Sequence, residues 1–512
     1  MRMDILAFAL YFVAMLAIGV FFFFKSKNTT EKDYFLGGRA MGPWVTAMSA
    51  QASDMSAWLL MGLPGSILAF GFGQAWIGIG LAIGTAANWI LVAKRLRKFS
   101  KAAGDSITLP QYLSNRFLTK SHTLSIICAV VFLVCFTIYV ASAFVAGSDV
   151  FTTLVPELEP STAMIIFAAI VVIYTFLGGF NAVCWTDFFQ GLLMIAALLI
   201  VPIVVGFTRN LDTSALSTIY TGPNGEEFEF VANFFNASWK DIVSGLGWGL
   251  GYFGMPHIIV RFMSIEKPSM VKKSATVAII WVVLSLAATI VIGYLGRMFV
   301  YSNGVDLSAD LLGNGKQALI FVKLAQDVFP AFIAGLLLAA IIAASMSTAD
   351  SQLLVAASSF ASDLYKPIIR KNASNKEMLW VSRIIVLVIA VIAYFIASSK
   401  GKAAQAIMDL VSNAWGIFGA AFGPAVLLSL FWKRFTYKGA VAGILAGAAV
   451  DMLWLWLPVA GSTLTAITGI YEIIPGFIIG GLAAIVVTLI DKKPSAEVEA
   501  IYARATDNSI DD

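Results

Sequence analysis

Charge is scarce in this sequence. Only 12% of its 512 residues are Asp, Glu, Lys or Arg, about half the share of a typical soluble protein, whereas 59% are hydrophobic. This composition predicts a polytopic membrane protein with little chain left over for a soluble domain. The net charge of +4 is dispersed among short connections, so it does not indicate binding to nucleic acid.

Cysteine and histidine are also rare. The sequence has three cysteines, all in or beside apolar runs, and two histidines far apart. These numbers exclude a disulfide framework and a Cys/His metal cluster. The first apolar run, 5–24, is too long for a signal-peptide core and lacks a small-residue cleavage site. It therefore predicts a first spanning helix.

What the sequence does have is long apolar runs, about thirteen at roughly 20 residues per span. They cover 4–24, 43–70, 74–93, 122–153, 159–178, 183–207, 238–262, 274–300, 317–360, 378–397, 404–431, 437–457 and 470–490. The fourth and ninth are long, and we expect them to be tilted or to extend beyond the bilayer. With the amino terminus outside, the Lys/Arg-rich connections fall on one side, which predicts a cytoplasmic carboxyl terminus.

Two of these runs are interrupted in the same way. Ser49–Trp58 contains hydroxyls and a carboxyl group. Gly245–Pro256 contains five glycines and a proline, which weaken a helix. Such residues expose backbone polar groups that lipid cannot satisfy, so they are tolerated where the freed carbonyls coordinate something. Paired interruptions point to the substrate and ion sites of a transporter.

The corresponding positions of the two breaks predict an all-α fold with an inverted repeat of five plus five helices. Segments two to six and seven to eleven form the two halves, and helices two and seven are discontinuous. The expected regions are an extra helix and loop (1–42), the first repeat (43–236), the second repeat (237–435), two further helices (436–491) and a short cytoplasmic tail (492–512).

Asp54 lies inside the first break. A carboxylate at membrane depth costs several kcal/mol unless it is paired or hydrated, which makes Asp54 a functional candidate. The alternative is that Asp54 caps a helix beginning at Met55 by accepting backbone N–H bonds. The two roles are compatible.

The ninth run contains a second candidate group. Ala344, Ser347 and Thr348 are spaced i, i+3 and i+4, so they share one helix face. Sodium prefers hard oxygen ligands, which backbone carbonyls and hydroxyls supply. The alternative is that these small residues only allow close helix packing.

Aromatic residues and one proline suggest a pocket for a small organic solute. They are Trp58, Tyr139, Trp248, Tyr252 and Pro256. The alternative for each is ordinary helix packing or an interface anchor.

Two further carboxylates lie in apolar runs. Asp187 is predicted at the cytoplasmic start of segment six, and Asp350 follows the Ser/Thr pair. Either is a candidate for a second cation station or for the exit path. For Asp187, the alternative is a carboxylate favoured by a helix N-terminus. Arg39 is predicted to be an interfacial cation that pairs with a carboxylate or lipid.

Several motifs resemble those of the sodium/solute symporter family over almost the whole length. They are Tyr-Phe-Leu-Gly-Gly-Arg (34–39), Ala-Ser-Asp-Met-Ser (52–56), Leu-Met-Gly-Leu-Pro-Gly (60–65), Phe-Thr-Ile-Tyr (136–139), Gly-Tyr-Phe-Gly (251–254), Pro-His-Ile-Ile-Val-Arg-Phe-Met (256–263), Met-Ser-Thr-Ala-Asp-Ser-Gln-Leu-Leu (346–354) and Tyr-Glu-Ile-Ile-Pro-Gly-Phe (471–477). The resemblance implies thirteen helices in a LeuT-type inverted repeat within a bacterial inner membrane. It also implies coupled uptake of one sodium ion with one L-proline, without a cofactor.

The resemblance also implies residue roles. Ala52, Met55 and Ala344 would offer carbonyls to sodium, with hydroxyls from Ser347 and Thr348. Asp54 would be essential for sodium-dependent binding. The proline pocket would contain Ser56, Ala57, Trp58, Tyr139, Trp248, Tyr252 and Pro256.

Two positions depart from the family pattern. Ala57 replaces the usual Gly, and Met255 replaces the usual Gln. The added methyl group and the lost polar group bear on which solute is preferred. A symporter for a betaine-like compound, pantothenate, a monocarboxylate or a sugar is therefore the nearest alternative. A channel would need a continuous hydrated pore, and an enzyme would need a catalytic dyad; neither pattern is evident.

Overall fold

The computed structural model describes residues 2–25, 30–221, 227–228, 230–305, 316–399, 405–459 and 461–507. The described chain is almost entirely helical. Two short antiparallel hairpins pair β1 (Tyr220–Thr221) with β2 (Glu227–Phe228) and β3 (Pro458–Val459) with β4 (Ser462–Thr463).

Several helices of the first half have a proline in their first turn, at positions 43, 64, 110 and 160, where proline suits a helix N-terminus. The helices of this half are α1 (Met3–Lys25), α2 (Glu31–Leu36), α3 (Pro43–Asp54), α4 (Leu63–Phe70), α5 (Ala75–Ala87), α6 (Lys94–Ala102), α7 (Leu109–Arg116), α8 (Thr123–Leu154) and α9 (Pro160–Thr208). A π-helical segment, Asn88–Ala93, joins α5 to α6.

The helices of the second half are α10 (Trp239–Gly247), α11 (Pro256–Ser264), α12 (Val271–Ser302), α13 (Ile320–Val328), α14 (Ala331–Ser359), α15 (Asn375–Ser399), α16 (Gln405–Phe431), α17 (Tyr437–Trp456), α18 (Leu464–Thr468), α19 (Ile473–Ile490) and α20 (Ala496–Thr506). A π-helical segment, Phe360–Ile369, continues α14.

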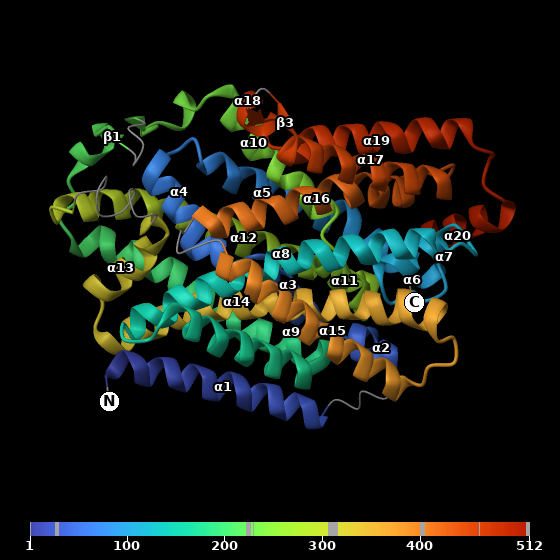
Figure 1. The fold of residues 1–512 in the computed structure, drawn as a ribbon, viewed down its shortest axis with the longest axis horizontal. Helices are drawn as coiled ribbons and strands as arrows, with labels where there is room; N and C mark the ends of the chain where they lie inside the picture. Colours follow the sequence, from blue (N-terminus) through green and yellow to red (C-terminus); the bar gives the residue numbers. More distant parts are fainter. Residues whose placement is uncertain are drawn as a thin grey trace.

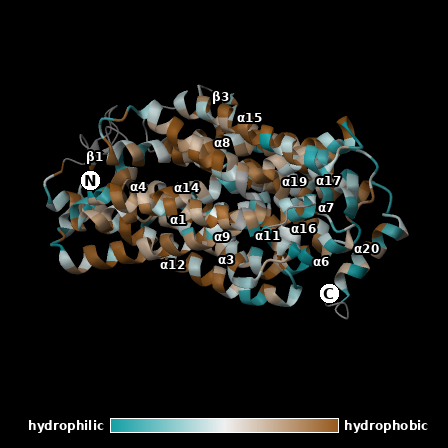
Figure 2. Ribbon diagram, turned by 90° about the horizontal axis from the view of Figure 1, so that it is seen from below, coloured by the Kyte–Doolittle hydropathy of each residue, from teal (hydrophilic) through white to brown (hydrophobic). Residues whose placement is uncertain are grey.

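The long helices run roughly side by side (Figure 1). Helix α14 is at the centre, buried along most of its length, and it packs against α1, α8 and α9. Hydrophobic residues predominate along the helices, and hydrophilic residues are concentrated near the end that carries α6, α7 and α20 (Figure 2). This arrangement is that of a helical protein embedded in a bilayer.

Within the described residues, ten helices are long and apolar enough to span a membrane, and Trp58–Phe70 and Pro160–Phe176 are shorter apolar helices. The predicted runs 43–70, 159–178 and 238–262 are missing from the ten because breaks or kinks shorten them. The multi-pass helical class is confirmed, and the count of thirteen stays a prediction.

Two predicted boundaries differ from the structure. Run 317–360 is not one tilted helix, because Pro330 separates α13 from α14. Runs 159–178 and 183–207 form one helical path, α9, with a kink at Gly179, whose φ of 65° suits glycine. Asp187 therefore lies two turns beyond the kink, and its assignment to a helix N-terminus is wrong.

Helix α5 approaches the second break backbone to backbone. A methyl group built on Gly80 would lie 2.2 Å from the Gly245 carbonyl oxygen, and one on Gly84 would lie 2.3 Å from that of Gly249. No side chain fits between these segments. The glycines of the second break are therefore required for close packing as well as for breaking the helix.

Candidate ion and solute site at the two helix breaks

The structure confirms the first break and limits the non-helical backbone to the few residues between Asp54 and Trp58. Helix α3 ends at Asp54, and Met55 leaves the helix with φ −84° and ψ 77°. The chain resumes at Trp58 as a π-helical turn. Pro64 explains this turn, because its ring has no N–H and would clash with the carbonyl of Leu60 in a regular α-helix.

A hydroxyl group of α14 lies between two carbonyls of the predicted sodium site. Ser347 Oγ donates to the Ala52 carbonyl oxygen at 2.7 Å and lies 3.2 Å from that of Ala344. The neighbouring Thr348 hydroxyl is buried and has no hydrogen-bond partner. The structure thus brings Ala52, Ala344 and Ser347 together and places Met55 three residues further along the first break.

Asp54 connects the first break to the second. Its side chain is fully buried, and its Oδ2 accepts a hydrogen bond of 2.6 Å from the Tyr252 hydroxyl. Its Oδ1 has no hydrogen-bond partner. The helix-cap alternative is wrong, because α3 ends at Asp54 and the residue before the next turn, Ala57, makes no side-chain cap.

The second break runs from the end of α10 to the start of α11. Residues Trp248–Phe253 form a 3-10 segment, and α11 begins at Pro256, with Met255 in extended geometry before it. Trp248 stacks on Tyr471, with ring centroids 5.0 Å apart. The predicted break Gly245–Pro256 is therefore confirmed, and its aromatic residues face α16 and the segment before α19.

Two polar side chains hold the irregular backbone of this break. Trp415 Nε1 donates to the Trp248 carbonyl at 2.8 Å, and Asn88 Nδ2 donates to the Tyr252 carbonyl at 2.9 Å. These bonds satisfy carbonyls that a regular helix would have paired. Sequence reasoning missed Trp415 and Asn88, because no local pattern distinguishes them from ordinary residues of an apolar helix. It quoted Tyr471 only as part of a family motif and gave it no role in the site.

Gly251 depends on this close packing. A methyl group built on Gly251 would lie 1.9 Å from Trp415 Nε1. We expect Gly251→Ala to displace Trp415 and to destabilise the protein by about 1–3 kcal/mol, measured as a lower melting temperature with altered tryptophan fluorescence. Gly73→Ala is the control, because its nearest neighbour would be 3.6 Å away, and an equal effect there would contradict the prediction.

The remaining predicted solute residues are buried around the first break. Ala57, Trp58 and Tyr139 are each no more than 2% exposed. The Tyr139 hydroxyl lies beside Ser56 and Trp58, although neither it nor the Ser56 hydroxyl makes a hydrogen bond of ordinary geometry. Both hydroxyls are therefore free to bind a polar ligand.

Seven of the buried polar atoms that have no hydrogen-bond partner lie on the segments that meet at the breaks. They are Gln51 Nε2, Asp54 Oδ1, Ser56 Oγ, Thr85 Oγ1, Asn88 Oδ1, Tyr139 Oη and Thr348 Oγ1. Buried polar groups in proteins are normally hydrogen-bonded, so these unpaired atoms fit a polar ligand bound at the breaks. Sequence reasoning missed Gln51 and Thr85.

Asp187 and Asp350 belong to a separate buried network. Arg261 Nη2 lies 3.0 Å from Asp187 Oδ2, and Ser49 Oγ donates to the same oxygen at 2.7 Å. Ser351 donates to Asp350 Oδ1 at 3.3 Å. Sequence reasoning missed Arg261, whose side chain is buried and neutralises Asp187.

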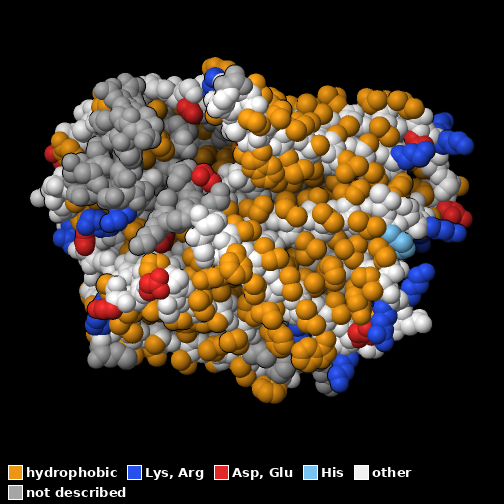
Figure 3. Space-filling view, viewed as in Figure 1, with side chains coloured by type: hydrophobic (Ala, Val, Ile, Leu, Met, Phe, Trp, Pro, Cys, Tyr) orange, Lys and Arg blue, Asp and Glu red, His pale blue; other side chains and the backbone are white. Residues whose placement is uncertain are grey.

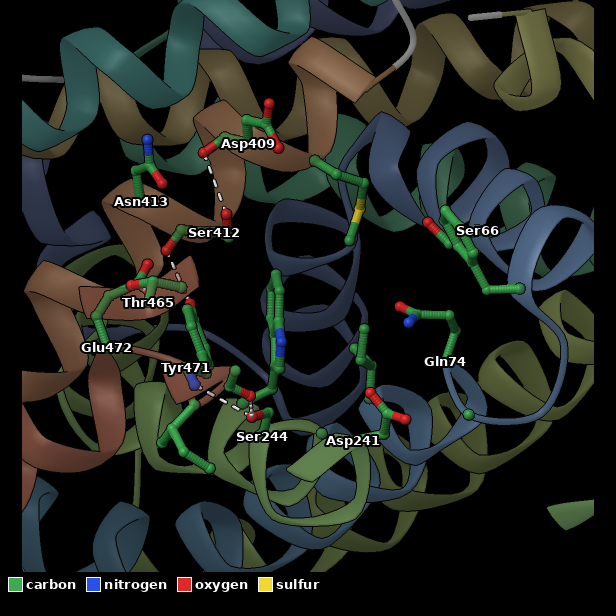
Figure 4. Close-up of a pocket in the computed structure, with 18 of the residues that line it drawn as sticks. Ser66, Gln74, Asp241, Ser244, Asp409, Ser412, Asn413, Thr465, Tyr471 and Glu472 are labelled. Atoms are coloured by element: carbon green, nitrogen blue, oxygen red, sulfur yellow. Dashed lines mark hydrogen bonds between the residues drawn. The ribbon is translucent and has the colours of Figure 1, made fainter. Parts of the chain in front are cut away.

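A cavity of about 430 Å³ lies above Trp248 and Tyr471. In Figure 4, Asp409, Ser412, Asn413 and Glu472 line one side, and Ser66, Gln74 and Asp241 line the other. Tyr471 donates through its hydroxyl to the Ser412 carbonyl at 2.7 Å. The stacked Trp248 and Tyr471 rings therefore form part of the wall of this vestibule, next to the second break.

The opposite end is closed by ion pairs around α2. Asp105 binds Lys32 and Arg39, with Arg39 Nε 2.8 Å from Asp105 Oδ1, and Lys366 pairs with Glu31. The carboxylate partner predicted for Arg39 is confirmed. Burial tends to raise the pKa of Asp105, but the hydrogen bonds and charges of Lys32 and Arg39 outweigh it and hold that pKa below its usual value.

We expect Asp105→Asn to loosen this closure and to speed hydrogen exchange in α2. Because the folded-state pKa is lowered, the contribution of Asp105 is present above its ordinary pKa and is lost as pH falls through the lowered value. Asp491→Asn is the control, since Asp491 pairs with Lys438 on other helices. Unchanged α2 exchange in Asp105→Asn would contradict the prediction.

The fold is shared with solved membrane transporters. The structure of a Na+-coupled sialic acid symporter in a substrate-bound outward-open state matches with a TM-score of 0.76 and 20% identity, over 97% of this chain and 99% of that one. Mhp1, a nucleobase-cation-symport-1 family transporter, matches with a TM-score of 0.55 and 14% identity, over 93% and 99%. These likenesses show that this chain has the multi-pass helical fold of the two transporters.

The sequence relatives narrow this class. The profile of the Sodium:solute symporter family matches residues 34–447, and the chain belongs to that family. The "Sodium/proline symporter" of Salmonella typhimurium is 42% identical over 98% of this chain and 96% of its own length. The "High-affinity proline transporter PutP" of Bacillus subtilis is 42% identical over 94% and 97%.

Proposed function

We propose that this protein couples inward sodium flux to the uptake of L-proline across a bacterial plasma membrane. The names of the relatives support both substrates. The observation that supports the chemistry best is the contact of Ser347 Oγ with the carbonyls of Ala52 and Ala344, which places three oxygen donors from α3 and α14 together. Sodium is here a transported substrate rather than a resident cofactor.

The sodium site comprises five residues. They are Ala52, Met55, Ala344, Ser347 and Thr348. The carbonyls of Ala52 and Met55 are offered because α3 ends at the break. The Ala344 carbonyl and the two hydroxyls come from the facing side of α14. Asp54 adds negative charge next to these oxygens without needing to touch the ion.

The solute pocket lies between the two breaks. It comprises Ser56, Ala57, Trp58, Tyr139, Trp248, Tyr252 and Pro256. The proline carboxylate faces exposed N–H groups and a helix N-terminus, and the ring packs among the aromatic side chains. Asp187 and Asp350 form a further polar station on the exit path, where Arg261 supplies the positive charge.

The proposed topology has thirteen helices, an external amino terminus and a cytoplasmic carboxyl terminus. The termini lie towards opposite ends of the molecule in Figure 1, which fits an odd number of crossings. On the visible face, Lys and Arg gather more densely where α6, α7 and α20 lie (Figure 3). Residues 43–236 and 237–435 are the proposed inverted repeats, flanked by 1–42, by 436–491 and by the tail 492–512.

Transport proceeds by alternating access. Sodium binds first from the vestibule and ties α3 to α14, and this tie orders Ser56 and Trp58 to receive proline. Because proline is a net-neutral zwitterion, each cycle moves one charge, and a membrane potential contributes about 2.3 kcal/mol per 100 mV to that step. Inward opening requires the α2 ion pairs to separate.

The test is sodium-driven uptake of labelled proline into proteoliposomes, with the transport current recorded. We expect accumulation and an inward positive current only when sodium and proline are both present. A competitor panel of betaine, pantothenate, a monocarboxylate and a sugar tests the solute, because Ala57 and Met255 lie at the pocket. The absence of proline uptake and current under a sodium gradient would refute the coupling. Better uptake of a competitor would refute proline as the preferred solute.

A further inference from the structure

Two buried carboxyl groups lie between the last long helices, away from the breaks. Asp451 of α17 is fully buried, and Glu472, just before α19, is 2% exposed. A methyl group built on Gly416 of α16 would lie 3.0 Å from Asp451 Oδ2 and 3.4 Å from Glu472 Cγ. Both side chains therefore reach the same small space, which Gly416 leaves open.

The two carboxyl groups lack the partners that such burial normally requires. Neither oxygen of Asp451 has a hydrogen-bond partner, and Glu472 Oε2 accepts one bond of 3.1 Å, from Thr465 Oγ1. Among the described ion pairs, none includes either carboxyl group. Two uncompensated acids in a low-dielectric setting require a cation or a proton.

A path for a cation leads to this space. Glu472 and Thr465 line the vestibule, as do Asp241 and Asp409. Carboxylates in a cleft concentrate cations from solution. Asp451 lies behind Glu472, and its Cβ would be 3.2 Å from a methyl group on Gly476, one turn along α19.

We propose that Asp451, Glu472 and Thr465 form a sodium-binding site in the vestibule wall, distinct from the site between α3 and α14. The donor set is hard oxygen, as sodium prefers. The described residues include no group of three or more His, Cys, Asp or Glu side chains that could hold a metal ion, which favours a monovalent cation over a divalent one.

Two residues next to the site, Tyr471 and Trp415, connect it to Trp248 of the solute pocket. Glu472 follows Tyr471, whose ring stacks on Trp248, and Gly416 follows Trp415, which binds the Trp248 carbonyl. Sodium at this site fixes Tyr471 and Trp415 and thereby the floor of the vestibule. Its role is to set the pocket for solute entry, and it is not carried across the membrane.

The test counts sodium ions with labelled sodium bound to the purified full-length protein at constant ionic strength. We expect two ions per wild-type protein, one in Asp451→Asn, one in Thr348→Ala and none in the double variant. If only Thr348→Ala still bound two sodium ions, the transport site would be refuted. If only Asp451→Asn still bound two, the site proposed here would be refuted, so the two proposals are separable.

Further variants guard against misfolding. Gly416→Ala keeps both charges and fills the space, and we expect at least a tenfold weaker sodium response of tryptophan fluorescence in the Thr348→Ala background. Asp409→Asn removes a vestibule charge outside the site and should retain both ions. The proposal is overturned if Asp451→Asn and Gly416→Ala leave the sodium count and the fluorescence response unchanged. That result would be expected if the two acids share a proton instead of binding sodium.

Discussion

Asp54→Asn is expected to lower the apparent sodium affinity of proline uptake by roughly a hundredfold. The substitution keeps the shape of the side chain and removes its charge. Two unit charges about 6 Å apart at an effective dielectric constant of 20 interact by about 3 kcal/mol, and each 1.4 kcal/mol corresponds to a factor of ten. The measurement is the sodium dependence of initial uptake rates in proteoliposomes.

Tyr252→Phe is the matched control for this experiment. It removes the hydroxyl that donates to Asp54 Oδ2 at 2.6 Å but leaves the carboxylate and the ring. We expect its main effect to be on proline affinity. The change in apparent sodium affinity should be at least tenfold smaller than in Asp54→Asn. Equal sodium shifts in the two variants would show that the hydrogen bond, and not the charge, is what sodium binding needs.

Asp187→Asn is expected to produce the largest loss of stability, because it leaves Arg261 buried without its anion. Breaking a buried ion pair costs about 3–5 kcal/mol, and here Arg261 Nη2 and Asp187 Oδ2 are 3.0 Å apart with both side chains almost fully buried. The measurement is the melting temperature of the detergent-solubilised protein.

A double-variant cycle separates the ion pair from simple burial. Arg261→Gln should be as harmful as Asp187→Asn, whereas the double variant Asp187→Asn/Arg261→Gln should regain part of the loss. Asp327→Asn serves as the control, since its pair with Lys323 is exposed and worth at most about 1 kcal/mol. Additive losses in the double variant would exclude the pairing as the cause.

The features predicted from sequence were those with local signals. Glycine, proline and hydroxyl residues inside apolar runs indicated both breaks, and the spacing of Ala344, Ser347 and Thr348 indicated a shared face. The family resemblance added Ala52 and Met55. The structure brings Ala52, Ala344 and Ser347 within hydrogen-bonding reach, although the role of each residue stays a prediction.

The features that sequence reasoning missed depend on distant partners. Tyr252 binds Asp54 from 198 residues away, and Arg261 reaches Asp187 across 74 residues. Periodicity tells which face of a helix a residue occupies, but not which helix it will meet. For the same reason, the sequence did not indicate that the Arg261 side chain lies in the core beside Asp187.

The glycine contacts between α5 and the second break restrict how the protein can move. Backbone packed directly on backbone has no rotamers to adjust, so Gly80 and Gly84 cannot slide past Gly245 and Gly249 without losing contact. Helix α5 and the outer half of the second break thus behave as one rigid body. Gly254, at the other end of the break, packs in the same way on the backbone of α16, so a change in the shape of the solute pocket must move these helices together with the break.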